Sequence, residues 1–356
     1  MSKRRDIPAA GARSRRPNTA VQALLLLAGT GLAAAAAGIA YSAFALPKQL
    51  ELPNAVSGER REVNGRAGRL SYYVAGQGAP LLLIHSINAA TSAYETRPLF
   101  EHYRATRKVY TIDLPGFGFS QRGDREYTPR LYANAILDLV ERIRGENPGQ
   151  QVDALALSLS CEFLARAASQ RPDHFRTLAL ISPTAFSKGA RFYEPPGTTL
   201  GTPTVARLLK QPLWARALFE GLNSRASQRY FTQRTFGSKN VDEGLLAYEY
   251  LTAHQPGAEF AALTFLSGVL FSADIDAVYD RLALPVWLAH GVRGDFQDYG
   301  GVAKVLNRPN WSVATFQSGA LPQFETLDEL IAGYDAFLQA AADAREAEGA
   351  RVGATV

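Results

Sequence analysis

Short apolar runs alternate with longer amphipathic stretches along most of the chain. The runs of strand length are 69–76, 80–86, 108–114, 152–157, 177–183, 285–291 and 311–317. Helical candidates lie at about 92–104, 128–145, 160–171 and 326–343. Buried strands that alternate with amphipathic helices are typical of a parallel sheet covered by helices. The pattern therefore predicts an α/β fold with a mainly parallel sheet, and its functional residues should lie where the carboxyl ends of the strands emerge.

The alternation breaks between about 184 and 284. This segment begins with the Gly- and Pro-rich stretch KGARFYEPPGTTLGTP and then becomes helical. Because the strand pattern resumes afterwards, we predict an inserted helical lid over the sheet edge rather than a separate helical domain. The main domain is expected at 59–343, after a linker at 47–58. Residues 344–356 lack large apolar side chains, which predicts a flexible tail.

An uncharged apolar run occupies residues 20–46, after a basic tail at 1–19. As a helix it would span about 40 Å, more than the roughly 30 Å hydrocarbon core of a bilayer. It lacks the polar face of a globular helix. A cleaved signal peptide is the alternative, because Ala43 and Ala45 form a small-x-small cleavage pattern after the apolar run. The run is, however, longer than the apolar core of a usual signal peptide. We expect an uncleaved single-pass transmembrane helix, with the basic N-terminus cytoplasmic and the main domain extracytoplasmic.

Charge and cysteine content exclude several classes of function. The formal net charge is +5, but the excess of basic residues lies in the N-terminal tail, and the rest of the chain is balanced. No nucleic-acid partner is therefore expected. The single cysteine excludes an internal disulfide framework and a cysteine-based zinc site. The chain has no metal-ligand cluster, phosphate-binding glycine loop or cofactor signature, so the prediction is no metal and no cofactor.

A serine, Ser158, stands where the strand 152–157 runs into the following helix. A serine at such a turn is exposed above the sheet, and helix amides point toward the oxyanion that forms during attack. The strand and helix backbones nearly touch there, and Ala156, Ser160 and Cys161 are all small. Ser158 is therefore a candidate nucleophile. Cys161 is expected to be a small buried residue rather than a reactive thiol.

Several further segments between about 60 and 340 resemble the α/β-hydrolase family. LLLIHSINAATSAYE, with His85, is similar to the family's oxyanion loop, and PVWLAHGVRGD is similar to the loop that carries the catalytic acid. IDLPGFGFS, at 112–120, is the most specific match. Asp113 within it is expected to bind turn amides rather than to transfer protons.

The resemblance implies a catalytic site at the carboxyl edge of the sheet. Ser158 occupies the nucleophile position, and Asp295 the acid position, with Asp298 as a second candidate. The backbone amides of Ile87 and Leu159 would form the oxyanion hole.

The histidine that should complete this site is absent. The segment SGALPQFE places Ala320 where the family has its base, and no histidine follows His290. His254, in the lid, is the candidate substitute base or substrate contact; the alternative is a hydrogen-bonded helix cap. We expect structural positions for the other histidines: His85 and His290 packed at strand ends, and His102 and His174 on the surface.

Two functions remain open from the sequence. The first is a membrane-anchored hydrolase that cleaves an ester or related bond of a small apolar substrate through Ser158, in a pocket formed by the aromatic-rich lid. The alternative is a non-catalytic pseudohydrolase that binds an apolar ligand or a membrane partner. Ala320 favours the alternative, because loss of the base from a serine triad costs about a millionfold in turnover. Ser158, Asp295 and the lid favour the enzyme.

Overall fold

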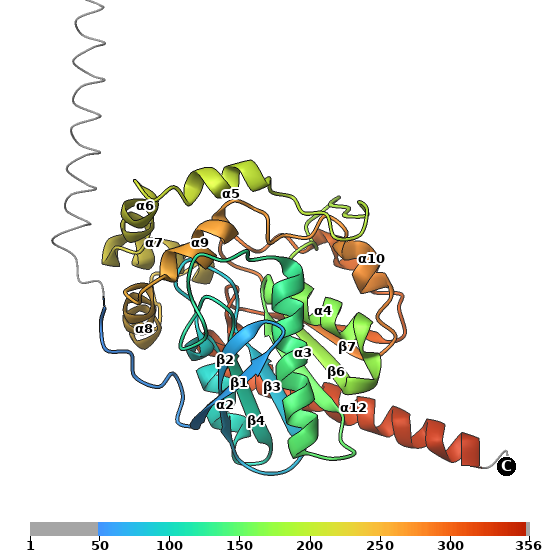
Figure 1. Ribbon diagram of the computed structural model, residues 1–356. Coiled ribbons are helices and arrows are strands. Elements are labelled where there is room, and N and C mark those ends of the chain that lie inside the picture. Colours follow the sequence, from blue (N-terminus) through green and yellow to red (C-terminus); the bar gives the residue numbers. More distant parts are fainter. Residues whose placement is uncertain (1–48, 354–356) are drawn as a thin grey trace, which may run out of the picture. The chain divides into compact units, whose positions relative to one another are not determined.

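The computed structural model describes residues 49–353, which lie in one compact unit built on an eight-stranded sheet (Figure 1). The strand order is β1-β2-β4-β3-β5-β6-β7-β8. The strands are β1 (Glu59–Gly65), β2 (Gly68–Ala75), β3 (Pro80–Ile84), β4 (Lys108–Asp113), β5 (Val152–Leu157), β6 (Phe175–Ile181), β7 (Val286–Gly291) and β8 (Trp311–Phe316). β1 and β2 are antiparallel to their neighbours, and the other pairs are parallel. The predicted, mainly parallel sheet is confirmed.

Helices cover both faces of the sheet. One face carries α3 (Pro129–Glu146), α4 (Ser160–Gln170) and α10 (Ile275–Asp280), and the other carries α2 (Arg97–Tyr103) and α12 (Leu327–Gly353) (Figure 1). Alternate residues of β5 serve the two apolar cores: Ala154 and Ala156 pack on the first side, and Leu155 and Leu157 on the second. This period of two explains why β5 reads as a continuous apolar run.

The lid consists of helices inserted between β6 and β7. They are α5 (Pro203–Leu209), α6 (Ala215–Leu222), α7 (Arg225–Phe236), α8 (Glu243–Ala253) and α9 (Ala258–Leu266). In Figure 1, α5 lies at the top of the domain, and α6, α7 and α8 lie along its left side. Arg122, in the loop after β4, connects this loop to α8 of the lid. Its guanidinium donates to Gly118 O (2.7 Å) and to Thr252 Oγ1 (3.0 Å).

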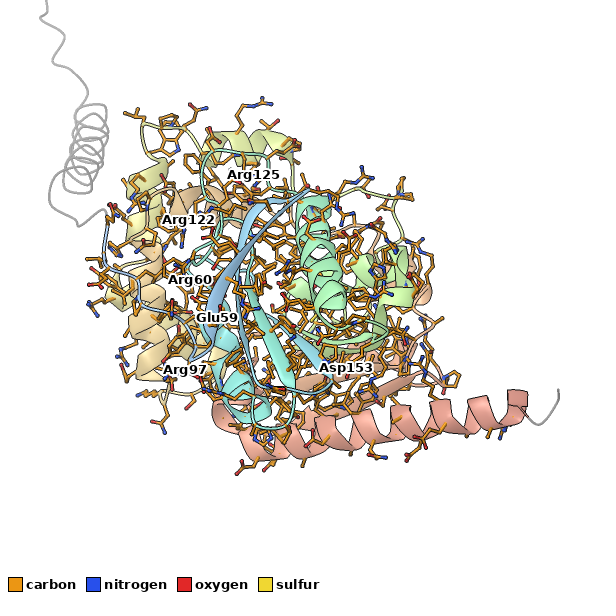
Figure 2. The ribbon with its side chains drawn as sticks, turned by 60° about the horizontal axis from the view of Figure 1, so that its bottom comes forward. Glu59, Arg60, Arg97, Arg122, Arg125 and Asp153 are labelled. Carbon is orange, nitrogen blue, oxygen red and sulfur yellow. The ribbon has the colours of Figure 1, made fainter. Side chains whose placement is uncertain are left out.

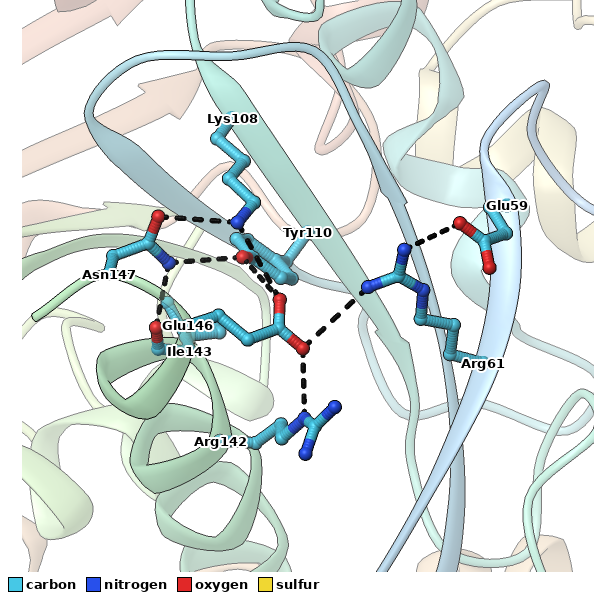
Figure 3. A network of polar contacts seen from close by, with 8 residues as sticks. All are labelled: Glu59, Arg61, Lys108, Tyr110, Arg142, Ile143, Glu146 and Asn147. Carbon is cyan, nitrogen blue, oxygen red and sulfur yellow. Dashed lines mark hydrogen bonds and ion pairs between the residues drawn. The ribbon is translucent and has the colours of Figure 1, made fainter.

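The edge strand β1 was not predicted, because its sequence ERREVNG is charged and mostly exposed. Such residues are what natural sheets use to protect an edge, and they conceal the strand pattern. A polar network anchors it (Figure 3): the Glu146 carboxylate accepts from Arg142 Nε (2.8 Å) and Tyr110 OH (2.9 Å) and lies 3.7 Å from Arg61 Nη1. Arg61 in turn pairs with Glu59 within β1.

A buried charge cluster lies at the start of β5. The Asp153 carboxylate accepts hydrogen bonds from Arg107, from Arg176 Nε (2.9 Å) and from Thr177 Oγ1 (2.6 Å) (Figure 2 labels Asp153). It joins the parallel strands β5 and β6 to the loop before β4.

Two predictions concern the chain ends. From residue 344 to Gly353 the tail continues α12 as a helix, because its Ala, Arg and Glu residues favour a helix; its flexibility stays a prediction. Arg345 also donates to Gln151 Oε1 (2.6 Å). The predicted transmembrane helix at 20–46 lies outside the described residues; within 49–353, no helix has the length and apolarity needed to cross a bilayer.

Candidate active site

Ser158 lies at the turn between β5 and α4 with a strained backbone. Its φ is 52°, in the left-handed region, which costs a non-glycine residue about 1–2 kcal/mol. Two main-chain hydrogen bonds hold the turn: Ser158 N donates to Ile181 O (2.8 Å), and Ser158 O accepts from Cys161 N (3.0 Å). The side chain is half-buried and lines a cavity. Cys161 is fully buried, and burial raises the pKa of its thiol, as expected of a structural residue.

The cavity has a volume of about 530 Å³ and lies between the carboxyl ends of the strands and the lid. Most of its wall is apolar. The aromatic residues that line it are Phe186, Phe192, Phe231, Phe265, Phe271, Phe296 and Tyr299. Ser158 and Leu159 come from the end of β5, Ile87 from the loop after β3, and Asp295 from the loop after β7. The structure thus brings together four of the five predicted site residues.

The backbone amides of Ile87 and Leu159 are available to a ligand. Within residues 49–353, neither amide donates a hydrogen bond to another residue. The neighbouring Ser86 amide, in contrast, donates to Glu95 Oε2 (2.7 Å). An oxyanion hole needs amide donors that are not already used, and both of these residues line the same cavity as Ser158.

His85 and Asp113 shape the loops around these amides. The His85 Nδ1–H donates to Ser86 O (2.6 Å), and its Nε2 accepts from Leu114 N (2.9 Å). Burial lowers the pKa of His85 to about 3, so the ring stays neutral. Asp113 accepts from the amides of Ala93 and Phe119, both at 3.0 Å. The structural roles expected for both residues are confirmed.

Ala320, at the position where the family resemblance places a histidine, also lines the cavity. Its main chain is fixed on both sides: the amide donates to Thr235 O (3.0 Å), and the carbonyl accepts from Ser182 Oγ (2.8 Å). Only a methyl group therefore stands at the base position. No histidine is among the described residues that line this cavity.

The structure does not bring His254 to Ser158. His254 caps the C-terminal end of α8, where its ring Nδ1 lies 2.7 Å from Tyr250 O and its ring centroid 4.1 Å from that of Tyr250. It is buried and lies outside the cavity wall. This placement corrects the expectation of a substitute base and matches the helix-cap alternative.

The other histidines have no place in the cavity wall either. His290 stacks on Tyr299 with ring centroids 4.1 Å apart, which fits the expected packed position. His102 is exposed as expected. His174, expected on the surface, is buried, because it lies in the tight turn between α4 and β6 rather than on an open helix face.

Asp295 and Asp298 reach the cavity wall but have partners of their own. The Asp295 carboxylate pairs with Arg234 of α7, with Oδ2 2.5 Å from Nε, and the Asp295 amide donates to Arg234 O (3.0 Å). Asp298 accepts from the amides of Lys188 and Gly300. The ion pair with Arg234 thus connects Asp295, at the acid position, to helix α7 of the lid.

Three buried carboxyl groups in the cavity wall were missed by the sequence analysis: Glu95, Glu162 and Glu249. Burial raises the pKa of all three, to about 7 for Glu162 and about 8 for Glu249. Glu162 accepts from Thr184 Oγ1 (2.5 Å) and Ser272 N (2.9 Å). Single glutamates within amphipathic helices resemble solvated surface residues, so the sequence held no signal for them.

The fold and the family profile agree. The profile of the alpha/beta hydrolase fold family matches residues 79–262, and the chain belongs to this family.

The chain is similar in sequence to two kinds of hydrolase. It is 26% identical over 218 residues to a pimeloyl-(acyl-carrier protein) methyl ester esterase of Aeromonas salmonicida, covering 60% of this chain and 76% of the esterase. It is 28% identical over 111 residues to a haloalkane dehalogenase of Agrobacterium fabrum, covering 30% of this chain and 34% of the dehalogenase. The match thus spans about a third of the dehalogenase.

Two solved structures show the same fold. One is a bacterial membrane phospholipase A, with a TM-score of 0.62, 18% identity and coverage of 91% of this chain and 97% of that one. The other is a serine hydrolase involved in carbazole degradation, with a TM-score of 0.63 and 15% identity. The match covers 80% of this chain and 99% of that one.

Proposed function

We propose that this protein is a serine-dependent esterase that cleaves an ester or related bond of a small, largely apolar substrate. The observation that carries the proposal is the strained backbone of Ser158 (φ 52°) at the cavity wall. Such strain persists only where the surrounding structure enforces it, and it concentrates at functional sites. It supports the proposal because Ser158 lines an apolar cavity together with Ile87 and Leu159, whose amides have no hydrogen-bond partner among the described residues.

The reaction would follow from this placement. Ser158 Oγ attacks the substrate carbonyl carbon, and the negative charge on the carbonyl oxygen is stabilised by the amides of Ile87 and Leu159. The leaving alkoxide takes a proton and departs, and water then hydrolyses the acyl-enzyme. The Ser158 proton needs an acceptor. The cavity wall offers a carboxyl group in place of imidazole, that of Glu162, whose pKa burial raises to about 7.

A second candidate is a pseudohydrolase that binds an apolar ligand without cleaving it. The methyl group of Ala320 favours it, because no imidazole reaches Ser158 from the described cavity wall. The same apolar cavity would serve this function.

A fluorophosphonate probe tests the proposal. We expect it to label the wild-type protein and not Ser158→Ala, with parallel loss of 4-nitrophenyl butanoate hydrolysis. Ser182→Ala is the matched control, because Ser182 is a cavity serine with a similar φ of 50°. It should keep its labelling. If the folded wild-type protein neither reacts with the probe nor cleaves the ester, the esterase proposal is refuted and the pseudohydrolase that binds an apolar ligand is retained.

The membrane location is a separate part of the proposal. It rests on the uncharged run 20–46 and the basic tail before it. We expect the full chain to remain with membranes after extraction at alkaline pH, and the domain after residue 58 to be digested by a protease added from the extracytoplasmic side.

A further inference from the structure

One wall of the cavity carries acidic groups without a basic partner. Glu95 and Glu249 are only 1% and 8% exposed, and neither forms an ion pair with a described residue. The only basic side chain in the described cavity wall is Arg234, which is already paired with Asp295. Burying carboxyl groups costs free energy unless partners compensate for it. Hydrogen bonds from Ser86 N (2.7 Å) and Ser86 Oγ (2.9 Å) compensate Glu95, whereas no main-chain amide of the described residues donates to Glu249.

Packing of the lid on the core holds the two groups close together. Glu95 lies on the short helix η1 (Ala93–Thr96), which follows the oxyanion loop, and Glu249 lies on α8 of the lid. Their neighbours Tyr94 and Tyr248 stack with ring centroids 4.8 Å apart, which fixes η1 against α8. Asn88 Nδ2 donates to Glu95 Oε1 (3.2 Å) and also contacts the Glu249 carboxyl group.

An unpaired acceptor completes this wall. Gln228 of α7 is 6% exposed and lines the cavity, yet its Oε1 accepts no hydrogen bond from a described residue. Its Nε2 makes only a long contact with Asn223 Oδ1 (3.4 Å). Gln228 lies one turn before Thr232, whose hydroxyl contacts Glu249, so the two side chains share a helix face. The wall therefore gathers two carboxyl groups and a free amide oxygen.

We propose that Glu95, Glu249 and Gln228 form a subsite for an ammonium group, so that the substrate is an ester with a primary or secondary amine remote from its reacting carbonyl. This proposal rests on the esterase function for its reaction and adds the class of substrate. An ammonium group has up to three N–H donors, which matches the acceptors of this wall. The methylene chain between amine and ester would lie along the phenylalanine rings of the cavity.

Charge balance gives the subsite its selectivity. A buried ammonium ion is costly unless it is paired and hydrogen-bonded, and the carboxyl pair supplies both. Opposite charge favours the ionised carboxylate, so binding of the amine should release a proton from the pair. A neutral isostere gains nothing from these groups.

Matched esters test the subsite. We would compare 4-nitrophenyl 6-aminohexanoate with 4-nitrophenyl heptanoate, in which a methyl group replaces the ammonium, and include shorter and longer homologues to scan the distance. The wild-type protein should prefer the best amino ester by about tenfold to a hundredfold in kcat/KM, as expected for charge-assisted hydrogen bonds. Glu249→Gln should abolish the preference while keeping heptanoate turnover. Glu243→Gln is the control, because Glu243 lies on the same helix but pairs with Arg229 outside the cavity.

A binding measurement separates this proposal from the esterase proposal. Calorimetry with 6-aminohexanamide and heptanamide needs no turnover: the amine should bind at least about tenfold more tightly, with proton release detected in buffers of different ionisation enthalpy. Selective amine binding without hydrolysis of any ester would retain the subsite and refute the esterase. Equal binding and equal turnover of the two series across all chain lengths would overturn the subsite. If Glu249→Gln does not fold, Gln228→Leu provides the second variant, and it should weaken amine binding only.

Discussion

Replacing Ala320 by histidine should restore a proton acceptor beside Ser158. The Ala320 side chain faces the cavity, and both of its main-chain hydrogen bonds, to Thr235 and from Ser182, are independent of the side chain. The cavity of about 530 Å³ has room for an imidazole. Ala320→His should therefore fold as the wild type does and add the missing group.

The size of the gain depends on Asp295. Loss of the base from a serine triad costs about a millionfold in kcat. A triad whose aspartate no longer orients the histidine has a kcat about ten-thousandfold lower than the intact triad. Because Asp295 is paired with Arg234, Ala320→His alone should raise kcat by about a hundredfold, or about 2.7 kcal/mol of barrier. Adding Arg234→Gln should release Asp295 and raise kcat further.

Steady-state hydrolysis of 4-nitrophenyl butanoate measures this gain. Ala320→Phe is the control for size without a proton acceptor, and Ser158→Ala in the Ala320→His background measures turnover that does not pass through the serine. If Ala320→His is folded but no faster than Ala320→Phe, then Ala320 does not occupy the base position and the assignment of the site is refuted.

Three further predictions concern stability. Asp153→Asn should destabilise the fold by about 3–5 kcal/mol in urea unfolding, because it leaves Arg107 and Arg176 without their buried anion; an unchanged midpoint would contradict the role of this cluster. Burial raises the pKa of Glu162 to about 7, above its ordinary 4.5, so the folded state holds this proton more tightly than the unfolded state. The free energy of unfolding should thus fall as pH rises from about 4.5 through about 7, and the difference between wild type and Glu162→Gln should show this slope in thermal unfolding; a difference independent of pH would count against it. Ser158→Gly should remove the left-handed strain and stabilise the protein by up to about 1 kcal/mol, whereas Ser158→Ala should not; equal stability of the two variants would show that the turn is unstrained.

The buried parallel strands could be predicted from the sequence because each is apolar on both faces. β5, for example, begins and ends at the residues that its apolar run predicts. The position of Ser158 followed from the same pattern, since a strand that turns directly into a helix leaves one residue at the sheet edge. The absence of a histidine at position 320 is likewise a property of the sequence alone.

What the sequence could not provide depends on contacts between segments far apart in the chain. β1 is a strand because it pairs with β2, not because of its own charged residues. Glu95 and Glu249 become one acidic wall only when α8 packs on η1, and Asp295 is drawn toward the lid by Arg234. His254 was a candidate base until the cap of α8 placed its ring outside the cavity. Local apolar patterns determine the buried strands of the sheet, but the electrostatic character of a site depends on which side chains burial brings together.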